Sequence, residues 1–510
     1  MDHRGQKPTC VAQVGNTAID QENQTKGLLE QFETLWEETR ESFGQKRTWE
    51  KAKAFALSSL VSMGRRTVRG IITTEGRQFQ DWTADYRLFS RGRLDSERLF
   101  EVPRRGVLEQ LSNNVPYVVA MDDSIFRKRG RKIHGVAYRR DPMSPPFHIN
   151  FVRGQRFLQI SAAMPQYDGP SPARMVPIDF AHCPTPQKPR KNASEENWRE
   201  YRRAKKEANI NLKGVERLCA LRSNLDGNLA SRKRLLVGAV DGRFTNSTVL
   251  KNMPERTVLI GRIRKDAKLY SLPRPETPGT RGRKPSYGER LPTPEELRKD
   301  NSIPWQKVTA FAAGKHHSFK IKTIAPVRWR TAGENRDLRL VIIAPLAYKL
   351  SMRSETLYRQ PAYLICTDLD MPLDKIIQYY IWRWDIEVNF RDEKHILDVR
   401  GAQVRHPESV EKVPALIIAS YAMLLLAARK AFGAGEHIAD ALPVPKWRRN
   451  KRRRRASTQK LINHAKGVAE LWGKSMGIDN FSGFINQSSE DKKPEKLRPH
   501  LQSVVLYTYN

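Results

Sequence analysis

The segment YYIWRWDIEVNFRDEKH, residues 379–395, decides how the rest of the sequence is interpreted. On one continuous helix, four polar side chains would share a stripe roughly 60° wide: Tyr380, Arg383, Glu387 and Lys394. A neighbouring apolar stripe would hold Ile377, Ile381, Trp384 and Val388. We therefore expect a helix that packs through this apolar stripe and presents a phenol, a guanidinium, a carboxylate and an ammonium beside it.

Two earlier segments place acids after apolar runs. PYVVAMDDS, residues 116–124, ends a β-rich run with Asp122 and Asp123, and RLLVGAVDGRF, residues 234–244, carries Asp241 after a continuous apolar strand. Carboxylates that converge from distant positions can hold Mg²⁺, which prefers oxygen ligands and is usually bound by few carboxylates together with substrate phosphate. Two such ions can promote cleavage of a phosphodiester.

Each acid also has an ordinary structural interpretation. The pair Asp122–Asp123 could cap the segment that follows, and Asp241 with its following glycine could form a hairpin turn. Glu387 could pair with Arg383 or Arg391 on its own helix. The hypothesis of a shared metal site is stronger than any of its parts, because Glu387 lies on a stripe of groups that can contact phosphate.

Composition favours a nucleic-acid partner. The 510 residues include 91 Lys and Arg against 55 Asp and Glu, a formal net charge of +36. Neutralising phosphates with such an excess releases counterions and drives binding, whereas solubility alone needs a much smaller charge. The four cysteines are scattered and suggest neither disulfides nor a zinc site. We expect no signal peptide, and we expect the apolar run over 413–428 to be a buried helix of a soluble cytoplasmic protein.

The sequence is expected to divide into six regions. A long polar helix is predicted over 195–225, within the first part of the catalytic core. The predicted regions are a disordered tail (1–27), an N-terminal helical DNA-binding domain (28–110), the first part of a catalytic core (111–263), a β-rich insertion (264–360), the second part of the core with the segment 379–395 (361–432), and a basic C-terminal region (433–510).

The spacing Tyr380-x2-Arg383-x3-Glu387-x6-Lys394 resembles the Y-R-E-K signature of bacterial insertion-sequence transposases of the DDE superfamily. The segments around Asp122 and Asp241 resemble the two strand-terminal aspartate motifs of that family, and a serine two positions after Asp122 favours it over Asp123. The resemblance implies an α/β (α+β) fold. Its ribonuclease H-like mixed-sheet core would be interrupted by a β-rich insertion and flanked by an N-terminal helical domain and a helical C-terminal region.

The same resemblance implies the function and the site. Asp122, Asp241 and Glu387 would be catalytic and would bind two Mg²⁺ ions, for which Mn²⁺ can substitute, while Tyr380, Arg383 and Lys394 would bind DNA. The protein would bind the terminal inverted repeats of its own insertion sequence, cleave them and transfer the strands to target DNA as a homodimer on paired ends. It would be cytoplasmic, associated with the bacterial nucleoid and without a membrane partner. A ribonuclease H-like endonuclease without strand transfer and a domesticated DNA-binding protein remain alternatives.

Overall fold

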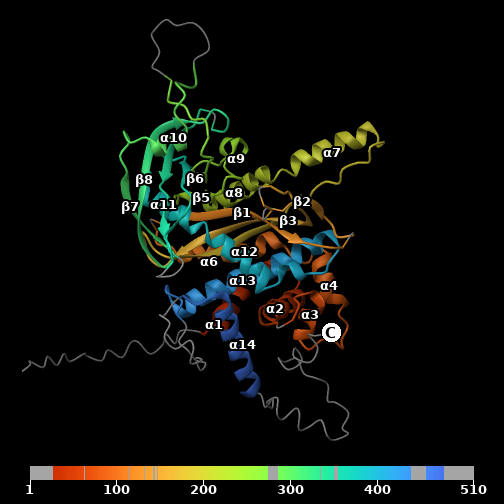
Figure 1. Cartoon of the computed structure of the whole chain (residues 1–510). Coiled ribbons are helices and arrows are strands. Elements are labelled where there is room, and N and C mark those ends of the chain that lie inside the picture. Colours follow the sequence, from red (N-terminus) through yellow and green to blue (C-terminus); the bar gives the residue numbers. More distant parts are fainter. Residues whose placement is uncertain are drawn as a thin grey trace, which may run out of the picture.

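The computed structural model describes residues 27–475, apart from 63, 114, 131, 142–143, 146, 274–284, 334, 350–353 and 438–454. Nearly all of the expected tail, and most of the basic C-terminal region, therefore lie outside the described residues. The described chain is a mixed α/β structure, in which one large sheet is covered by helices (Figure 1).

The sheet begins as a compact mixed core. Its first strands are β1 (Tyr117–Arg127), β2 (Ala137–Arg140), β3 (Phe151–Pro165), β4 (Ala173–His182), β5 (Leu236–Val240) and β6 (Thr257–Arg262). Strands β4, β3 and β1 pair antiparallel, and β1, β5 and β6 pair parallel. The order β4-β3-β1-β5-β6, with helices between β4 and β5, is a ribonuclease H-like core, so the predicted fold class is confirmed.

Four further strands extend this sheet beyond β6. They are β7 (Gln306–Ala312), β8 (Lys315–Arg328), β9 (Asp337–Ile343) and β12 (Ala362–Cys366), in the order β6-β12-β9-β8-β7. The β-rich residues after 264 therefore share one continuous sheet with the core. A short helix α10 (Pro294–Lys299) and the small pair β10 (Ala347–Tyr348) and β11 (Leu357–Tyr358) complete this part.

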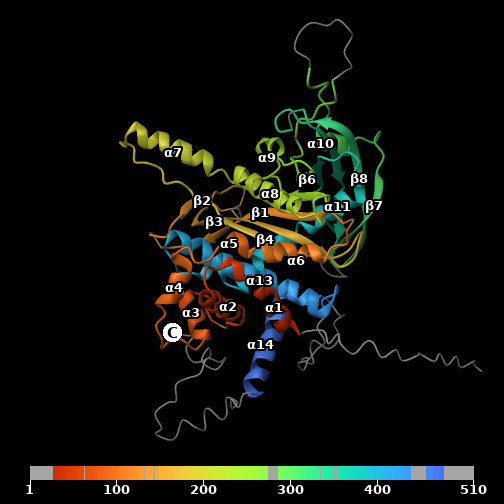
Figure 2. The ribbon, with the colours of Figure 1, turned by 180° about the vertical axis from the view of Figure 1, so that it is seen from behind.

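Within the described residues, six α-helices precede the sheet and pack below it (Figure 2): α1 (Leu28–Glu37), α2 (Lys46–Val61), α3 (Val68–Thr74), α4 (Thr83–Ser90), α5 (Ser96–Leu99) and α6 (Glu101–Glu109). They surround α13 (Pro407–Phe432), and their buried side chains join one apolar cluster with it. Gly106 illustrates the close contact, because a Cβ there would stand 2.7 Å from the Leu426 side chain.

Helix α13 contains the apolar run over 413–428. Among the described residues it is the one helix whose length and composition would allow it to cross a membrane, and 89% of its most apolar window is buried in the protein. The expectation of a buried helix is confirmed. Because the side chains of α13 pack against the sheet and the N-terminal helices, the helix serves as the central core element.

Two predicted helices are interrupted in the structure. The region 195–225 forms α7 (Glu195–Glu207) and α8 (Ile210–Gly227), and Asn209 caps the second helix by accepting a hydrogen bond from the backbone N–H of Asn211 at 2.9 Å. Helix α7 has no buried residue and projects from the body of the protein (Figure 1). A short helix α9 (Ser247–Lys251) follows β5.

The segment 379–395 is likewise divided, into α11 (Leu373–Trp382) and α12 (Asp385–His395). At the junction the backbone N–H groups of Trp384 and Glu387 bond three residues back, to Ile381 and Trp384, each at 3.1 Å. Because of this tighter turn, the side chains of α12 point in other directions relative to α11 than they would on one continuous α-helix. As a result the predicted apolar stripe is wrong for Trp384, which is 61% exposed.

Ile377 is buried as predicted, but the other buried side chains of this face differ from the predicted ones. Trp382 is 6% exposed, and its indole N–H donates to the Ser171 carbonyl at 2.8 Å. The buried side chains of this face are Ile376, Ile377, Tyr379, Trp382, Ile386 and Phe390, and they pack on Val118 and Ala120 of β1. This packing fixes α11 and α12 against the sheet.

Candidate active site

The parallel pairing of β1 with β5 brings the first two acids together. The register matches Met121 with Val240, so Asp122 and Asp241 are the next residues of two adjacent strands. Adjacent strands lie about 4.8 Å apart, which makes these carboxylates close neighbours. Strand β1 continues to Arg127 beyond Asp122, so the predicted end of the strand at the two acids is wrong.

The surroundings of Asp122 favour its protonated form. Burial, and then the nearby charge of Asp241, raise the pKa of Asp122 to about 7.

Asp241 follows β5 directly, and its carboxylate accepts a hydrogen bond from the backbone N–H of Arg243 at 2.9 Å. The strands on either side of Asp241 are parallel, so the turn after it does not form a hairpin. Two such carboxylates repel one another unless a cation or a proton lies between them.

Asp123 faces the opposite way and is already paired. Its carboxylate accepts from Nε of Arg156 at 2.8 Å and from Nη1 of Arg243 at 2.6 Å. Successive side chains of a strand point to opposite faces, so Asp122 shares the face of Val118 and Ala120, on which α11 and α12 pack. The structure therefore separates the two neighbouring acids by both orientation and charge pairing.

Arg383 connects Asp122 with Glu387. Its Nη1 lies 4.0 Å from Oδ2 of Asp122, and its Nη2 donates to Oε1 of Glu387 at 3.2 Å. The structural interpretation of Glu387, an ion pair with Arg383 four residues before it, is therefore also confirmed. Because Arg383 contacts both acids, its guanidinium links Asp122 on β1 with Glu387 on α12.

Tyr380 and Lys394 flank this group. The Arg383 guanidinium lies 5.5 Å from the centre of the Tyr380 ring, and burial raises the pKa of Tyr380 against the opposing charges of Arg383 and Arg262. Burial lowers the pKa of Lys394, whose ammonium also experiences the charge of Asp122. The structure thus brings all six predicted site residues to one region of the sheet.

Polar contacts hold α12 in place. Nδ2 of Asn389 donates to the Met175 carbonyl of β4 at 3.0 Å. Asp392 accepts from the Thr458 hydroxyl, at the start of α14 (Thr458–Ser475), at 2.7 Å. Both contacts involve buried groups, so they orient the helix that carries Glu387.

Glu393 and Gln159 were missed by the sequence analysis. Gln159 is the cross-strand partner of Asp122 on β3, and its side-chain amide donates to Oε1 of Glu393 at 2.9 Å. Glu393 is fully buried, and burial raises its pKa to about 8. In the sequence Glu393 lies among charged residues and gives no signal of burial; only the register of β3 reveals the contact.

The donor groups fit a divalent cation. No cluster of three or more His, Cys, Asp or Glu side chains forms a complete metal cage among the described residues. Mg²⁺ rarely needs such a cage, because it keeps several waters and binds through one or two carboxylates plus substrate phosphate. The adjacent Asp122 and Asp241, with the raised pKa of Asp122, provide such a pair.

Comparison with known protein families gives one match. The family model described as DDE superfamily endonuclease covers residues 39–335, and the chain belongs to this family. The match includes Asp122 and Asp241 and ends before α12. No curated protein matches the chain.

Membership defines the general activity. The protein is a DDE-type, nucleic-acid-cleaving enzyme of the nuclease and transposase class, its substrate is DNA, and its family generally uses divalent metals.

Proposed function

We propose that the protein is a DNA transposase that binds the terminal inverted repeats of its own insertion sequence, cleaves them and joins the freed strand to target DNA. The observation that carries this proposal is the link from Asp122 through Arg383 to Glu387, beside Asp241. It places the first acid, the third acid and a phosphate-binding group of the proposed signature within one set of contacts.

Each residue has a distinct role in the proposal. Asp122, Asp241 and Glu387 hold two Mg²⁺ or Mn²⁺ ions, which when bound would activate the attacking oxygen and stabilise the leaving one. Arg383 positions the scissile phosphate, and its Nε lacks a hydrogen-bond acceptor among the described residues, so donor capacity remains. Lys394 contributes a point charge and Tyr380 a ring and hydroxyl beside the DNA end.

The N-terminal helices supply a second DNA contact in this proposal. Trp82, just before α4, is 55% exposed, and Tyr86, on α4, is 37% exposed. The centres of their rings lie 5.6 Å apart. The positive charge of Arg69 interacts electrostatically with Tyr86. A basic surface with exposed polar or aromatic side chains is typical of DNA-binding domains, so in this proposal these residues are candidates for contacting the terminal repeats.

The decisive experiment uses the DNA that borders the gene. Purified protein, Mg²⁺ and a duplex carrying the element's own end should yield nicked ends and products joined to a target plasmid. Cleavage without joined products would support the endonuclease alternative. Binding without cleavage would support a domesticated DNA-binding protein.

We also propose that the protein forms a homodimer on paired DNA ends, and gel filtration of the DNA complex tests this stoichiometry directly. We propose a cytoplasmic, nucleoid-associated location.

A further inference from the structure

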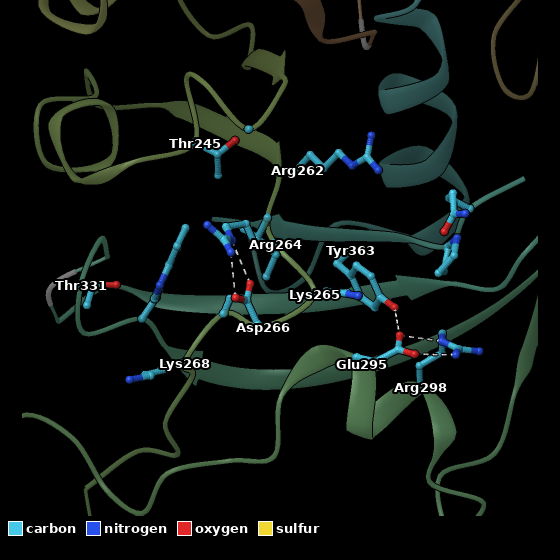
Figure 3. A pocket seen from close by; sticks show the side chains of 16 residues that line it. Thr245, Arg262, Arg264, Lys265, Asp266, Lys268, Glu295, Arg298, Thr331 and Tyr363 are labelled. Atoms are coloured by element: carbon cyan, nitrogen blue, oxygen red, sulfur yellow. Dashed lines mark hydrogen bonds and ion pairs between the residues drawn. The ribbon is translucent and has the colours of Figure 1, made fainter. Parts of the chain in front are cut away.

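A pocket of about 900 Å³ lies beside the candidate active site (Figure 3). We call it the insertion pocket. One wall comes from Gly242 and Thr245, just after Asp241, and the other from α10 and the residues that follow β8. Its floor is the segment that leaves β6, residues 262–268. The pocket therefore connects the catalytic edge of the sheet with the added strands.

The acids of the insertion pocket are already neutralised. The Asp266 carboxylate accepts two bonds from Arg264, both at 2.9 Å. Glu295 accepts from Arg298 at 2.9 and 2.7 Å and from the Tyr363 hydroxyl, and these bonds lower the pKa of Glu295 to about 2 (Figure 3). Both carboxylates are therefore occupied, and neither is left to bind a cationic ligand.

Three cations of the pocket remain available. Arg262, Lys265 and Lys268 are exposed, and none forms an ion pair with a carboxylate in the described part of the chain. Since the other charges cancel within their own pairs, these three give the pocket a positive potential. Such a potential selects an anionic ligand.

The pocket continues directly from the candidate active site. The Thr245 hydroxyl donates to the Asp241 carbonyl at 2.7 Å. Arg262 follows Gly261, and Gly261 pairs with Val240 across β5 and β6. The positive charge of Arg262 interacts electrostatically with Tyr380 and opposes the rise in its pKa. The insertion pocket therefore adjoins Asp241 and Tyr380 of the candidate active site.

We propose that the insertion pocket binds a short single-stranded segment of the DNA substrate, adjacent to the cleaved phosphodiester, through phosphate contacts to Arg262, Lys265 and Lys268. This inference rests on the proposed function. A volume of this size is typical of small-ligand pockets, so we expect it to take a short unpaired segment and not a duplex. A basic channel that follows the backbone is the usual way to hold an unpaired strand without reading its sequence.

The test compares two DNAs in metal-free buffer, where no cleavage occurs. One is a blunt duplex and the other carries a four-nucleotide single-stranded extension; binding of the full-length protein is measured by fluorescence anisotropy. The parent protein should bind the extended DNA at least tenfold more tightly. The R262A/K265A/K268A variant should lose this preference, and its salt dependence on extended DNA should fall by about two units of slope, since each single-strand phosphate contact contributes about 0.7.

A matched control removes the same charge elsewhere. Lys307, Lys315 and Lys320 are exposed on β7 and β8, away from the pocket lining. The K307A/K315A/K320A variant should keep the preference for extended DNA. Equal binding of both DNAs by the parent, an unchanged preference in R262A/K265A/K268A, or an equal loss in the control would each overturn the proposal. Deoxythymidine monophosphate that competes as well as a tetranucleotide would also contradict binding of a strand.

These readouts are independent of catalysis. If the cleavage and strand-transfer assay fails while the preference for extended DNA depends on the three cations, the proposed transposase activity is wrong and the pocket assignment stands. If transposition products form and the preference is absent, the pocket assignment alone is wrong.

Discussion

Strand β1 carries two consecutive aspartates whose surroundings are opposite. Asp123 is held by two arginines, whereas Asp122 faces another acid, and its nearest cation contact is Arg383 at 4.0 Å. A carboxylate with matched partners stabilises the fold, while one that is buried beside another acid, with only a distant cation, costs stability and is available to a metal. The comparison separates a structural acid from a candidate catalytic one within a single dipeptide.

The largest expected effect concerns the third acid. Glu387→Gln preserves size and removes the charge, so magnesium-dependent cleavage of an end-containing duplex should fall by about a thousandfold or more. Glu393→Gln on the same helix is the control, because burial raises the pKa of Glu393 to about 8 and favours its neutral form at pH 7. Glu393→Gln should change cleavage less than tenfold; similar rates for the two variants would remove Glu387 from the site.

The next effect concerns the structural acid. Asp123→Asn leaves Arg156 and Arg243 without their carboxylate, and the free energy of unfolding should fall by about 3 kcal/mol. Chemical denaturation in metal-free buffer measures the loss. Asp122→Asn, one residue away, should not destabilise the protein. Equal destabilisation by both substitutions would show that the two faces of β1 do not differ as described.

The role of Asp122 also predicts a dependence on pH. Its pKa is about 7 in the folded protein, against an ordinary value of 3.8 for an aspartate. Between about pH 4 and pH 7 the folded state therefore keeps a proton that the unfolded state has lost. Stability in metal-free buffer should therefore decrease as pH rises from about 4 to 7 and then level off. Asp122→Asn removes this contribution.

The difference between the parent and Asp122→Asn should grow by about 2 kcal/mol over this range, a value reduced for the partial exposure of the side chain. Denaturation curves at several pH values measure it. A difference that does not change with pH would show that Asp122 is ionised throughout.

The smallest effect tests the packing of the junction between α11 and α12. Trp384 is 61% exposed, so Trp384→Ala should change the free energy of unfolding by less than about 0.5 kcal/mol. Trp382, 6% exposed and bonded to Ser171, should lose about 3–5 kcal/mol on substitution by alanine. Thermal and denaturant melts of the two variants would contradict this description if the order were reversed.

The strands that carry Asp122 and Asp241 could be predicted because apolar runs followed by acids are local patterns, and the mixed-sheet fold was predicted from the resemblance to a known family. The sequence did not predict the break at Arg383, since the tightened turn there depends on how the buried side chains of α11 and α12 pack against the sheet. The same limit applies to β4, to the contact between Gln159 and Glu393, and to the way the predicted β-rich insertion joins the core sheet. Each depends on strand register, which a single sequence does not encode locally.

The most direct test of the account is metal binding, because it requires neither the terminal repeat nor an active element. Mn²⁺ is titrated into the full-length parent, Asp122→Asn and Asp123→Asn proteins by calorimetry at pH 8, under conditions where all three are folded. Asp122→Asn should weaken binding at least about tenfold through loss of a carboxylate ligand, and Asp123→Asn should leave it within about twofold of the parent. Loss of binding in Asp123→Asn, with parental affinity in Asp122→Asn, would contradict the assignment of the metal site to the Asp122 face.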